Sequence, residues 1–198
     1  MIDVDFIEIG TSDFDTLIET ADDTTIGFSI DPLQSYLDNL PYKPKVKTCC
    51  LAISGKCEPN QQIEVFYLPK KVIKYKNLPD WFMGCNAVGA YHKQHIIWKV
   101  EEFVERVKVP VMSLGDFYDL HKIRGCKFLK IDTEGHDVVI LDEFANYLKD
   151  KSSAYYPKKI EFETNDLSDP DKVSYIIKKF MNIGYNLEFR GNDTTLTF

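Results

Sequence analysis

The sequence predicts an α/β protein with a doubly wound, mostly parallel sheet that ends in an antiparallel hairpin. Short runs rich in β-branched and aromatic residues alternate with segments whose apolar residues have helical spacing. Two of the strand-like runs end in acidic residues immediately before a helix is expected to begin. The chain finishes with two short runs, 186–189 and 195–198, around the turn sequence Gly191-Asn192-Asp193. Together these patterns indicate parallel βα units that are closed by a hairpin.

Length and composition are typical of one folded domain. The 198 residues are 44% hydrophobic and 13% aromatic, which fits a single globular domain spanning residues 1–198. The formal net charge of −7 argues against a nucleic-acid partner, because binding to a phosphate backbone requires an excess of Lys and Arg. We see no signal-peptide pattern and no apolar run of membrane length, so we expect a cytoplasmic protein without a membrane partner. The five cysteines form no zinc spacing, and we expect reduced thiols.

The first two predicted strands each lead into a turn with polar side chains. Residues 4–9 form the first strand, and Gly10-Thr11-Ser12-Asp13 supplies turn and N-cap residues before a helix that begins near Phe14. Residues 24–31 form the second strand, which ends at Asp31, and a helix from Pro32 to about Leu40 follows. In nucleotide-binding α/β folds, an acid about twenty residues after the glycine turn accepts hydrogen bonds from ribose hydroxyls. Asp31 has that position relative to Gly10.

The middle of the chain predicts strands that are interrupted by one long irregular segment. We expect a third, buried strand over residues 46–54 and a fourth, antiparallel strand over 62–68. A further strand over 103–112 leads to a short helix over 116–121.

Residues 69–99 are too rich in aromatic residues for a linker and too irregular for a core element. Long irregular segments in compact domains are often binding loops, so we interpret this segment as an insertion on the substrate side. Its candidate substrate-binding residues, which can stack on a ligand or form hydrogen bonds with it, are Trp81, Asn86, Tyr91 and His92. His92 and His95 could share a helix face, but no neighbouring cysteine or carboxylate completes a ligand set, and we therefore predict no metal site.

Residues 127–141 read as a strand, an acidic turn and a helix. The strand 127–131 is followed by Asp132, Thr133, Glu134 and Gly135, and then by a helix whose apolar positions are Val138, Leu141, Phe144, Ala145 and Leu148. Ligands of open α/β sheets bind at the carboxyl ends of the strands, so Asp132, Glu134 and His136 are expected to face a ligand. The alternative is that Asp132 and Thr133 only cap the helix, Glu134 offsets the helix dipole, and His136 is solvated.

The last part of the chain completes the sheet. Residues 158–164 alternate and predict another strand, and Val173, Ile176, Ile177, Phe180 and Met181 mark an amphipathic helix that ends near Gly184.

Three segments resemble the FkbM-type methyltransferases, which transfer a methyl group from S-adenosylmethionine, usually to a hydroxyl. The run FLKIDTEGHDVVIL is similar to their K-I-D-x-E-G-x-E signature, with His136 at the variable position and Asp137 where the family usually has Glu. The run FIEIGTSDFD resembles the first methyltransferase motif, with Glu8 as its acid and Gly10 as its glycine. FSIDP resembles the F-E-P step of the family. The chain departs from the family in the first motif, because Phe14, preceded by Asp13, stands where the second glycine is usual.

This resemblance implies a Rossmann-like, class I methyltransferase fold and S-adenosylmethionine as the cofactor. The cofactor-binding residues that it implies are Glu8, Gly10, Thr11, Ser12, Asp31 and Asp132. His136 or Glu134 would act as the catalytic base for a small-molecule or glycan acceptor, and Glu163 is a third acid that could face the cleft. The alternative function is a non-catalytic binding module whose cofactor site is closed by Asp13 and Phe14.

Overall fold

A seven-stranded main sheet forms the centre of the computed structural model, which describes residues 1–198. Its strands are β1 (Ile2–Ile9), β2 (Gly27–Asp31), β3 (Val46–Cys50), β8 (Ile123–Ile131), β9 (Lys159–Glu163), β10 (Asn186–Arg190) and β11 (Asp193–Thr197). They lie in the order β10-β11-β9-β8-β1-β2-β3. The first three strands, β8 and β9 are parallel, and the hairpin β10–β11 joins the sheet antiparallel to β9. The predicted fold class is confirmed.

The strand order reverses direction at β1, and this reversal positions the site. The chain runs from β1 outward to β2 and β3, and then returns to place β8 on the other side of β1. Ile9 pairs with Ile30 on β2 and with Ile131 on β8, so these three strands end at the same level. Ligands of open α/β sheets bind in the crevice at such a reversal.

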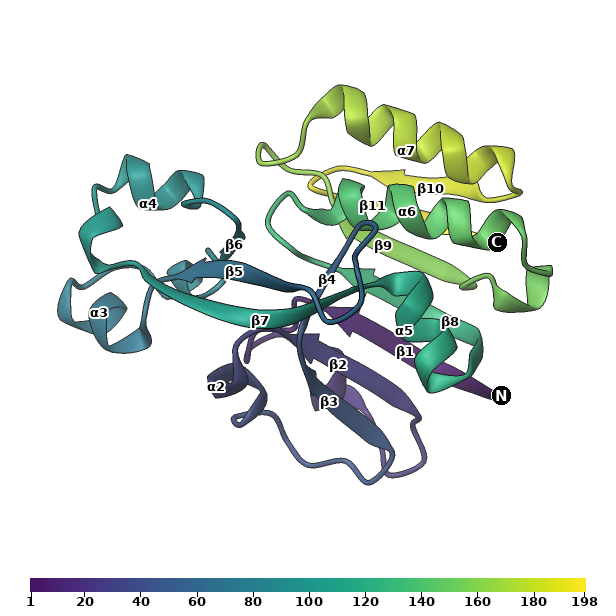
Figure 1. Cartoon of the computed structure of the whole chain (residues 1–198), viewed down its shortest axis with the longest axis horizontal. Helices are drawn as coiled ribbons and strands as arrows, with labels where there is room; N and C mark the ends of the chain where they lie inside the picture. The colour runs from purple at the N-terminus through teal and green to yellow at the C-terminus, as the bar shows by residue number, and fades with distance from the viewer.

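Three helices form one layer against the main sheet (Figure 1): α5 (Leu114–His121), α6 (Asp137–Lys149) and α7 (Pro170–Asn182). All five apolar positions predicted for the helix after residue 136 are buried in the main core.

The other face of the sheet has a thinner cover, in which Ile18 of α1 (Leu17–Thr20) packs near Phe6. No helix in the structure combines the length and the hydrophobicity needed to cross a lipid bilayer.

A second sheet contains β4 (Ala52–Ser54), β5 (Gln62–Tyr67), β6 (Ala87–Val88) and β7 (Glu105–Ser113), in the order β4-β7-β5-β6. The prediction of one buried strand over 46–54 is therefore wrong. The chain leaves the main sheet at Leu51, and β4 pairs with β7 instead. Because β3 is an edge strand, Lys47 and Thr48 are exposed rather than buried.

The first two predicted helices are shorter than their apolar spacing indicated. Helix α1 has four residues and begins only at Leu17, because left-handed backbone at Ser12 and Asp15 keeps the preceding segment in a loop. Helix α2 (Gln34–Leu37) is also a single turn, so the predicted helix from Pro32 to Leu40 is too long.

The insertion over residues 69–99 contains several short elements and extends the second sheet away from α5, α6 and α7 (Figure 1). These elements are α3 (Lys70–Tyr75), the 3-10 helix η1 (Asp80–Met83), β6 and α4 (Lys93–Ile97). Two further 3-10 helices lie elsewhere, η2 (Glu101–Phe103) and η3 (Ser153–Tyr155). A small core supports the insertion and consists of Leu68, Ile73, Phe82, Cys85 and Val100. The Tyr36 hydroxyl donates to the Met83 carbonyl at 2.7 Å, which ties the insertion to α2.

Candidate functional site

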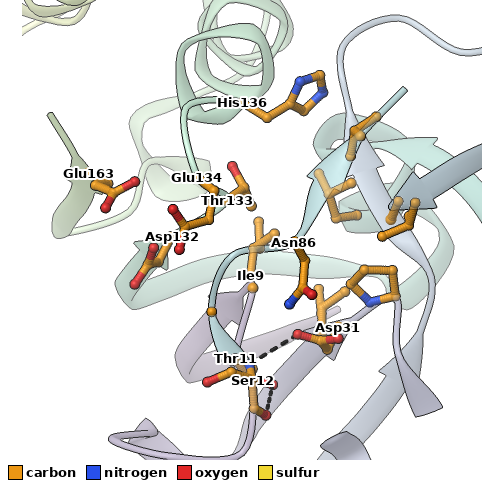
Figure 2. Close-up of a pocket in the computed structure, with 18 of the residues that line it drawn as sticks. Ile9, Thr11, Ser12, Asp31, Asn86, Asp132, Thr133, Glu134, His136 and Glu163 are labelled. Carbon is orange, nitrogen blue, oxygen red and sulfur yellow. Dashed lines mark hydrogen bonds between the residues drawn. The ribbon is translucent and has the colours of Figure 1, made fainter. Parts of the chain in front are cut away.

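A cavity of about 260 Å³ lies where the carboxyl ends of β1, β2 and β8 meet the insertion (Figure 2). This volume is close to the lower end for small-molecule pockets, roughly 300 Å³. The cavity brings together nine of the twelve residues predicted for the site: Gly10, Thr11, Ser12, Asp31, Trp81, Asn86, Asp132, Glu134 and His136. Glu8, Tyr91 and His92 do not line it.

Gly10 allows two distant turns to touch. Its φ is +79°, and a Cβ atom at this position would lie 1.8 Å from the carbonyl oxygen of Asp132. The backbone N–H of Asp132 in turn donates to the Ile9 carbonyl at 2.9 Å. Only glycine accepts both this left-handed conformation and this close approach.

Asp31 closes the glycine turn from the neighbouring strand. Its carboxyl accepts from the Ser12 N–H at 3.0 Å and from the Leu33 N–H at 2.7 Å (Figure 2 shows the Ser12 bond). Burial raises the pKa of Asp31 to about 7, although these two backbone hydrogen bonds oppose the shift. A carboxylate has about four acceptor positions, so two remain for a ligand.

The altered residues of the glycine turn do not close the cavity. Asp13 forms an ion pair with Lys70 of α3 and accepts from the Asn39 side chain at 2.8 Å, and it does not line the cavity. Phe14 does line the cavity and is 41% exposed. Phe14 therefore forms part of the pocket wall, and the cavity is present despite the missing second glycine.

Glu8 lies behind the pocket rather than in it. It is 1% exposed and accepts from the Leu17 N–H at 2.9 Å and from Lys130 Nζ at 3.0 Å. Burial raises the pKa of Glu8, and the charge of Lys130 opposes this rise. Glu8 therefore holds the start of α1 and the Lys130 side chain, and it does not line the pocket.

The acidic turn after β8 is shaped by Asp137, which the sequence did not single out as a site residue. Asp137 is fully buried, and its carboxyl accepts from Thr133 Oγ1 at 2.9 Å and from the Glu163 N–H at 3.3 Å. Burial, and next the charge of Asp132, raise the pKa of Asp137 to about 7. The interpretation that Asp132 and Thr133 cap α6 is wrong, because the N-cap residue is His136 and no side chain bonds to the cap.

Left-handed backbone turns the acidic side chains toward the cavity. Glu134 has a φ of +55°, and Gly135 has a φ of +92° with the Leu167 carbonyl oxygen 2.9 Å from where a Cβ would lie. A non-glycine residue in this region is uncommon, and such strain gathers at functional sites. Asp132 and Glu134 consequently lie in the loop before α6, and both line the pocket.

Three carboxyl groups, those of Asp132, Glu134 and Glu163, lie on one side of the cavity (Figure 2). Desolvation, and next the negative charge of Glu134, raise the pKa of Glu163 to about 9 and that of Asp132 to about 6. The Oε2 atom of Glu163 is buried without a hydrogen-bond partner. A positively charged ligand would relieve this mutual repulsion and stabilise the ionised carboxylates.

His136 also lines the pocket, and a hydrogen bond with Ser54 fixes its ring. Its Nε2 atom lies 2.8 Å from Oγ of Ser54 in β4, and its other ring nitrogen has no partner in the protein. Burial lowers the pKa of His136 below 6.5, so its imidazole is neutral at neutral pH and can accept a proton. Ser54 could not be recognised from the sequence, because its contact with His136 depends on the break between β3 and β4.

The insertion supplies the remaining wall of the pocket. Trp81 stacks on Phe82 with a ring separation of 4.6 Å, and Asn86 donates to the Met83 carbonyl at 3.0 Å while its Oδ1 atom is buried without a partner. Tyr91 instead packs on Phe66, away from the cavity lining.

Glu163 should make the stability of the ligand-free protein depend on pH. The pKa of Glu163 in the folded protein is about 9, above the ordinary 4.5. The stability that the protonated carboxyl contributes to the folded state is therefore fully present below pH 4.5 and is lost as pH rises through 9. Glu163→Gln should therefore raise the unfolding free energy at pH 9 by at least about 1 kcal/mol, since no charge is then buried. Urea unfolding at pH 5 and pH 9 measures this.

The matched control is Glu161→Gln on the same strand, where the carboxylate pairs with Lys159 at 2.7 Å. This variant should keep the parental pH dependence. If Glu163→Gln is no more stable than the parent at pH 9, the raised pKa is incorrect.

The strand order, the glycine turn and the acid-lined pocket together describe a doubly wound α/β protein with a pocket at the strand ends, the place where open α/β sheets bind their ligands. The sequence model of the methyltransferase FkbM domain matches residues 9–169. The chain belongs to this methyltransferase family. Neither the curated proteins nor the solved structures contain a significant match to it.

Proposed function

We propose that this protein is an S-adenosylmethionine-dependent methyltransferase that acts on a hydroxyl group of a small molecule or glycan. One observation carries the proposal: a pocket at the carboxyl ends of β1, β2 and β8 has Asp31 on one side and a cluster of acids on the other. The family supports methyl transfer, and the pocket supports this cofactor.

The polar groups of the pocket fit the chemistry of S-adenosylmethionine. The cofactor has two ribose hydroxyls, for which Asp31 has free acceptor positions. It also carries a sulfonium and an amino group, which suit the carboxyls of Asp132, Glu134 and Glu163 on Coulomb grounds. The unpartnered oxygens of Asn86 and Glu163 are acceptors that a bound donor would satisfy.

The bound cofactor would supply an electrophilic methyl group, and the residues of the protein would prepare the acceptor. His136, whose neutral ring is fixed at Nε2 by Ser54, would orient the acceptor hydroxyl and take its proton, and the bound cofactor would supply the methyl group. Trp81 and the residues around it cover the pocket and exclude water.

Asp31→Ala should weaken binding of S-adenosylmethionine by at least about tenfold, because charge-assisted hydrogen bonds to the ribose contribute roughly 1.5–3 kcal/mol each. Calorimetric titration with S-adenosylmethionine and with its demethylated product measures the change. Asp23→Ala, which changes an exposed acid before β2, is the control and should bind both ligands as the parent does. Parental affinity in a folded Asp31→Ala protein would remove Asp31 from the cofactor site. A parent protein that binds neither ligand would refute the proposed function.

A further inference from the structure

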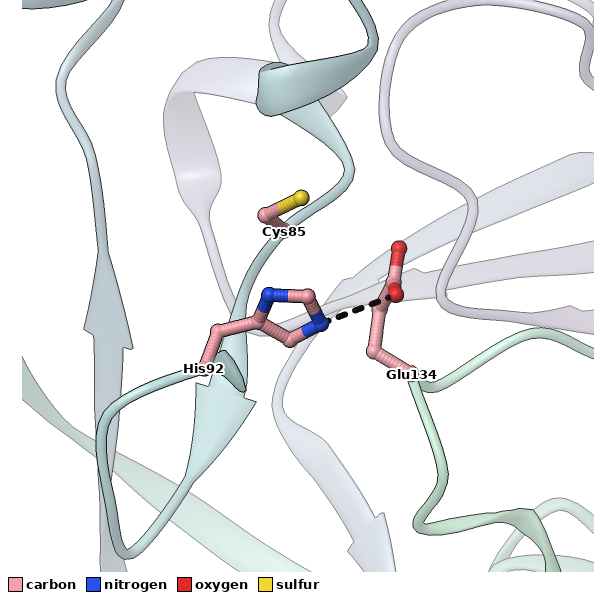
Figure 3. A group of neighbouring side chains, drawn as sticks. All are labelled: Cys85, His92 and Glu134. Carbon is pink, nitrogen blue, oxygen red and sulfur yellow. Dashed lines mark hydrogen bonds and ion pairs between the residues drawn. The ribbon is translucent and has the colours of Figure 1, made fainter. Parts of the chain in front are cut away.

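Cys85, His92 and Glu134 converge beside the pocket although they come from three separate segments (Figure 3). Cys85 follows η1, His92 precedes α4, and Glu134 lies in the acidic turn after β8. One ligand atom from each residue lies within 4.8 Å of the other two. Cys85 and His92 are each 3% exposed, so the cluster is shielded from bulk solvent on the insertion side.

We propose that these three residues bind a zinc ion. A thiolate sulfur, an imidazole nitrogen and a carboxylate oxygen are the ligand types that Zn²⁺ combines in proteins. The buried cysteine and histidine do not line the pocket, which leaves them without a direct role in ligand binding. Glu134 does line it, so the metal would lie in the wall between the pocket and the core of the insertion.

A second observation supports a ligand at this place. His95 of α4 is fully buried, and its ring lies 5.7 Å from that of His92. Neither of its ring nitrogens makes a well-aligned hydrogen bond, although the backbone of Cys85 lies within reach of the ring. Unsatisfied buried polar groups are rare in folded proteins and frequently mark a bound ion or water. Three protein ligands leave one of the four usual zinc positions for a further ligand.

The hydrogen bonds of His92 define what must change when a metal binds. Its Nδ1 atom accepts from the Gln94 N–H at 3.1 Å, which places the ring proton on Nε2, 3.2 Å from Glu134 Oε2. The zinc ion would replace this proton between the two residues. The ring proton would move to Nδ1 with loss of the bond to Gln94, and the thiol of Cys85 would release its proton to solvent as the zinc–sulfur bond forms.

A zinc ion bound by these three residues would cross-link the insertion to the acidic turn after β8. Glu134 has a left-handed backbone, and its carboxylate would be fixed from behind by the metal while its other oxygen remains near the pocket. This inference does not rest on methyl transfer, because metal binding can be measured without cofactor or acceptor.

The test is zinc binding to the full chain after removal of metal with a chelator. Competition with a chromophoric chelator should give one Zn²⁺ per chain, and Co²⁺ should give the sulfur charge-transfer and visible bands of a tetrahedral thiolate site. Cys85→Ser and His92→Gln should each weaken zinc binding by at least about a hundredfold, because even the loss of outer partners costs 10–100-fold. Cys57→Ser and His121→Gln, which change a cysteine and a histidine outside the cluster, should bind as the parent does.

Any of three results would overturn the proposal. The first is parental zinc affinity in Cys85→Ser or His92→Gln. The second is a zinc X-ray absorption spectrum of the parent protein without a sulfur ligand, a measurement that does not require the variants to fold. The third is a parent protein that binds no zinc. Titration with S-adenosylmethionine separates each of these failures from a failure of the proposed function.

Discussion

Gly10→Ala is expected to lower the free energy of unfolding by at least about 3 kcal/mol, which corresponds to a fall in Tm of roughly 6 °C or more. The added methyl group would lie 1.8 Å from the Asp132 carbonyl oxygen, and the φ of +79° disfavours any side chain. The strand ends must separate to accommodate it, so binding of S-adenosylmethionine should be lost as well. Thermal unfolding and calorimetric titration measure the two effects.

Gly89→Ala is the matched control for this change. Gly89 has a nearly identical φ of +75°, but no atom lies within 4 Å of the added Cβ. Gly89→Ala should lower the free energy of unfolding by only about 1 kcal/mol, the cost of a left-handed backbone at a residue with a side chain. Equal losses in the two variants would show that the contact between Gly10 and Asp132 contributes nothing.

His136→Asn should slow methyl transfer by about a hundredfold or more while the affinity for S-adenosylmethionine stays nearly unchanged. The variant removes the neutral imidazole that accepts the proton and leaves the acids of the pocket in place. Because burial lowers the pKa of His136 below 6.5, the parental rate should fall only on the acid side of that value. The acid limb of the pH–rate profile should disappear in the variant.

Single-turnover kinetics on an accepted substrate tests this, with His121→Asn in α5 as a control that should keep the parental rate. Ser54→Ala should have an intermediate effect, since it removes the partner of Nε2 and leaves the ring in place. A parental rate in His136→Asn would leave Glu134 as the remaining candidate base.

Local patterns in the sequence were sufficient to predict the parallel sheet and much of the site. The strand, turn and helix predicted over residues 127–141, with apolar helix positions to Leu148, are present in the structure, because periodicity and turn residues act between neighbouring positions. Asp31 and Asp132 could be assigned to one edge because parallel strands end at the same level. These predictions use only the order of elements and the ends of strands.

Other features depend on contacts between distant segments. The apolar run 46–54 does not reveal that the chain changes sheets at Leu51. Glu8 occupies the acidic position of its motif, yet the approach of Lys130 and the Leu17 N–H withdraws it from the pocket. The neighbours of His92 were also hidden, because Cys85 and Glu134 reach it only after the insertion folds onto the acidic turn.

The position of β1 between β2 and β8 has a consequence for how the protein is made. Lys130 and Glu8, which lie in paired strands, are 122 positions apart in the chain. Pairing over such a separation is slow, and until β8 is synthesised one edge of β1 has no neighbour. Asp31 and Asp132 cannot come together before that pairing. Ligand binding therefore requires that β1 and β8 have paired, so the N-terminal part of the chain alone, up to β2, cannot form the site.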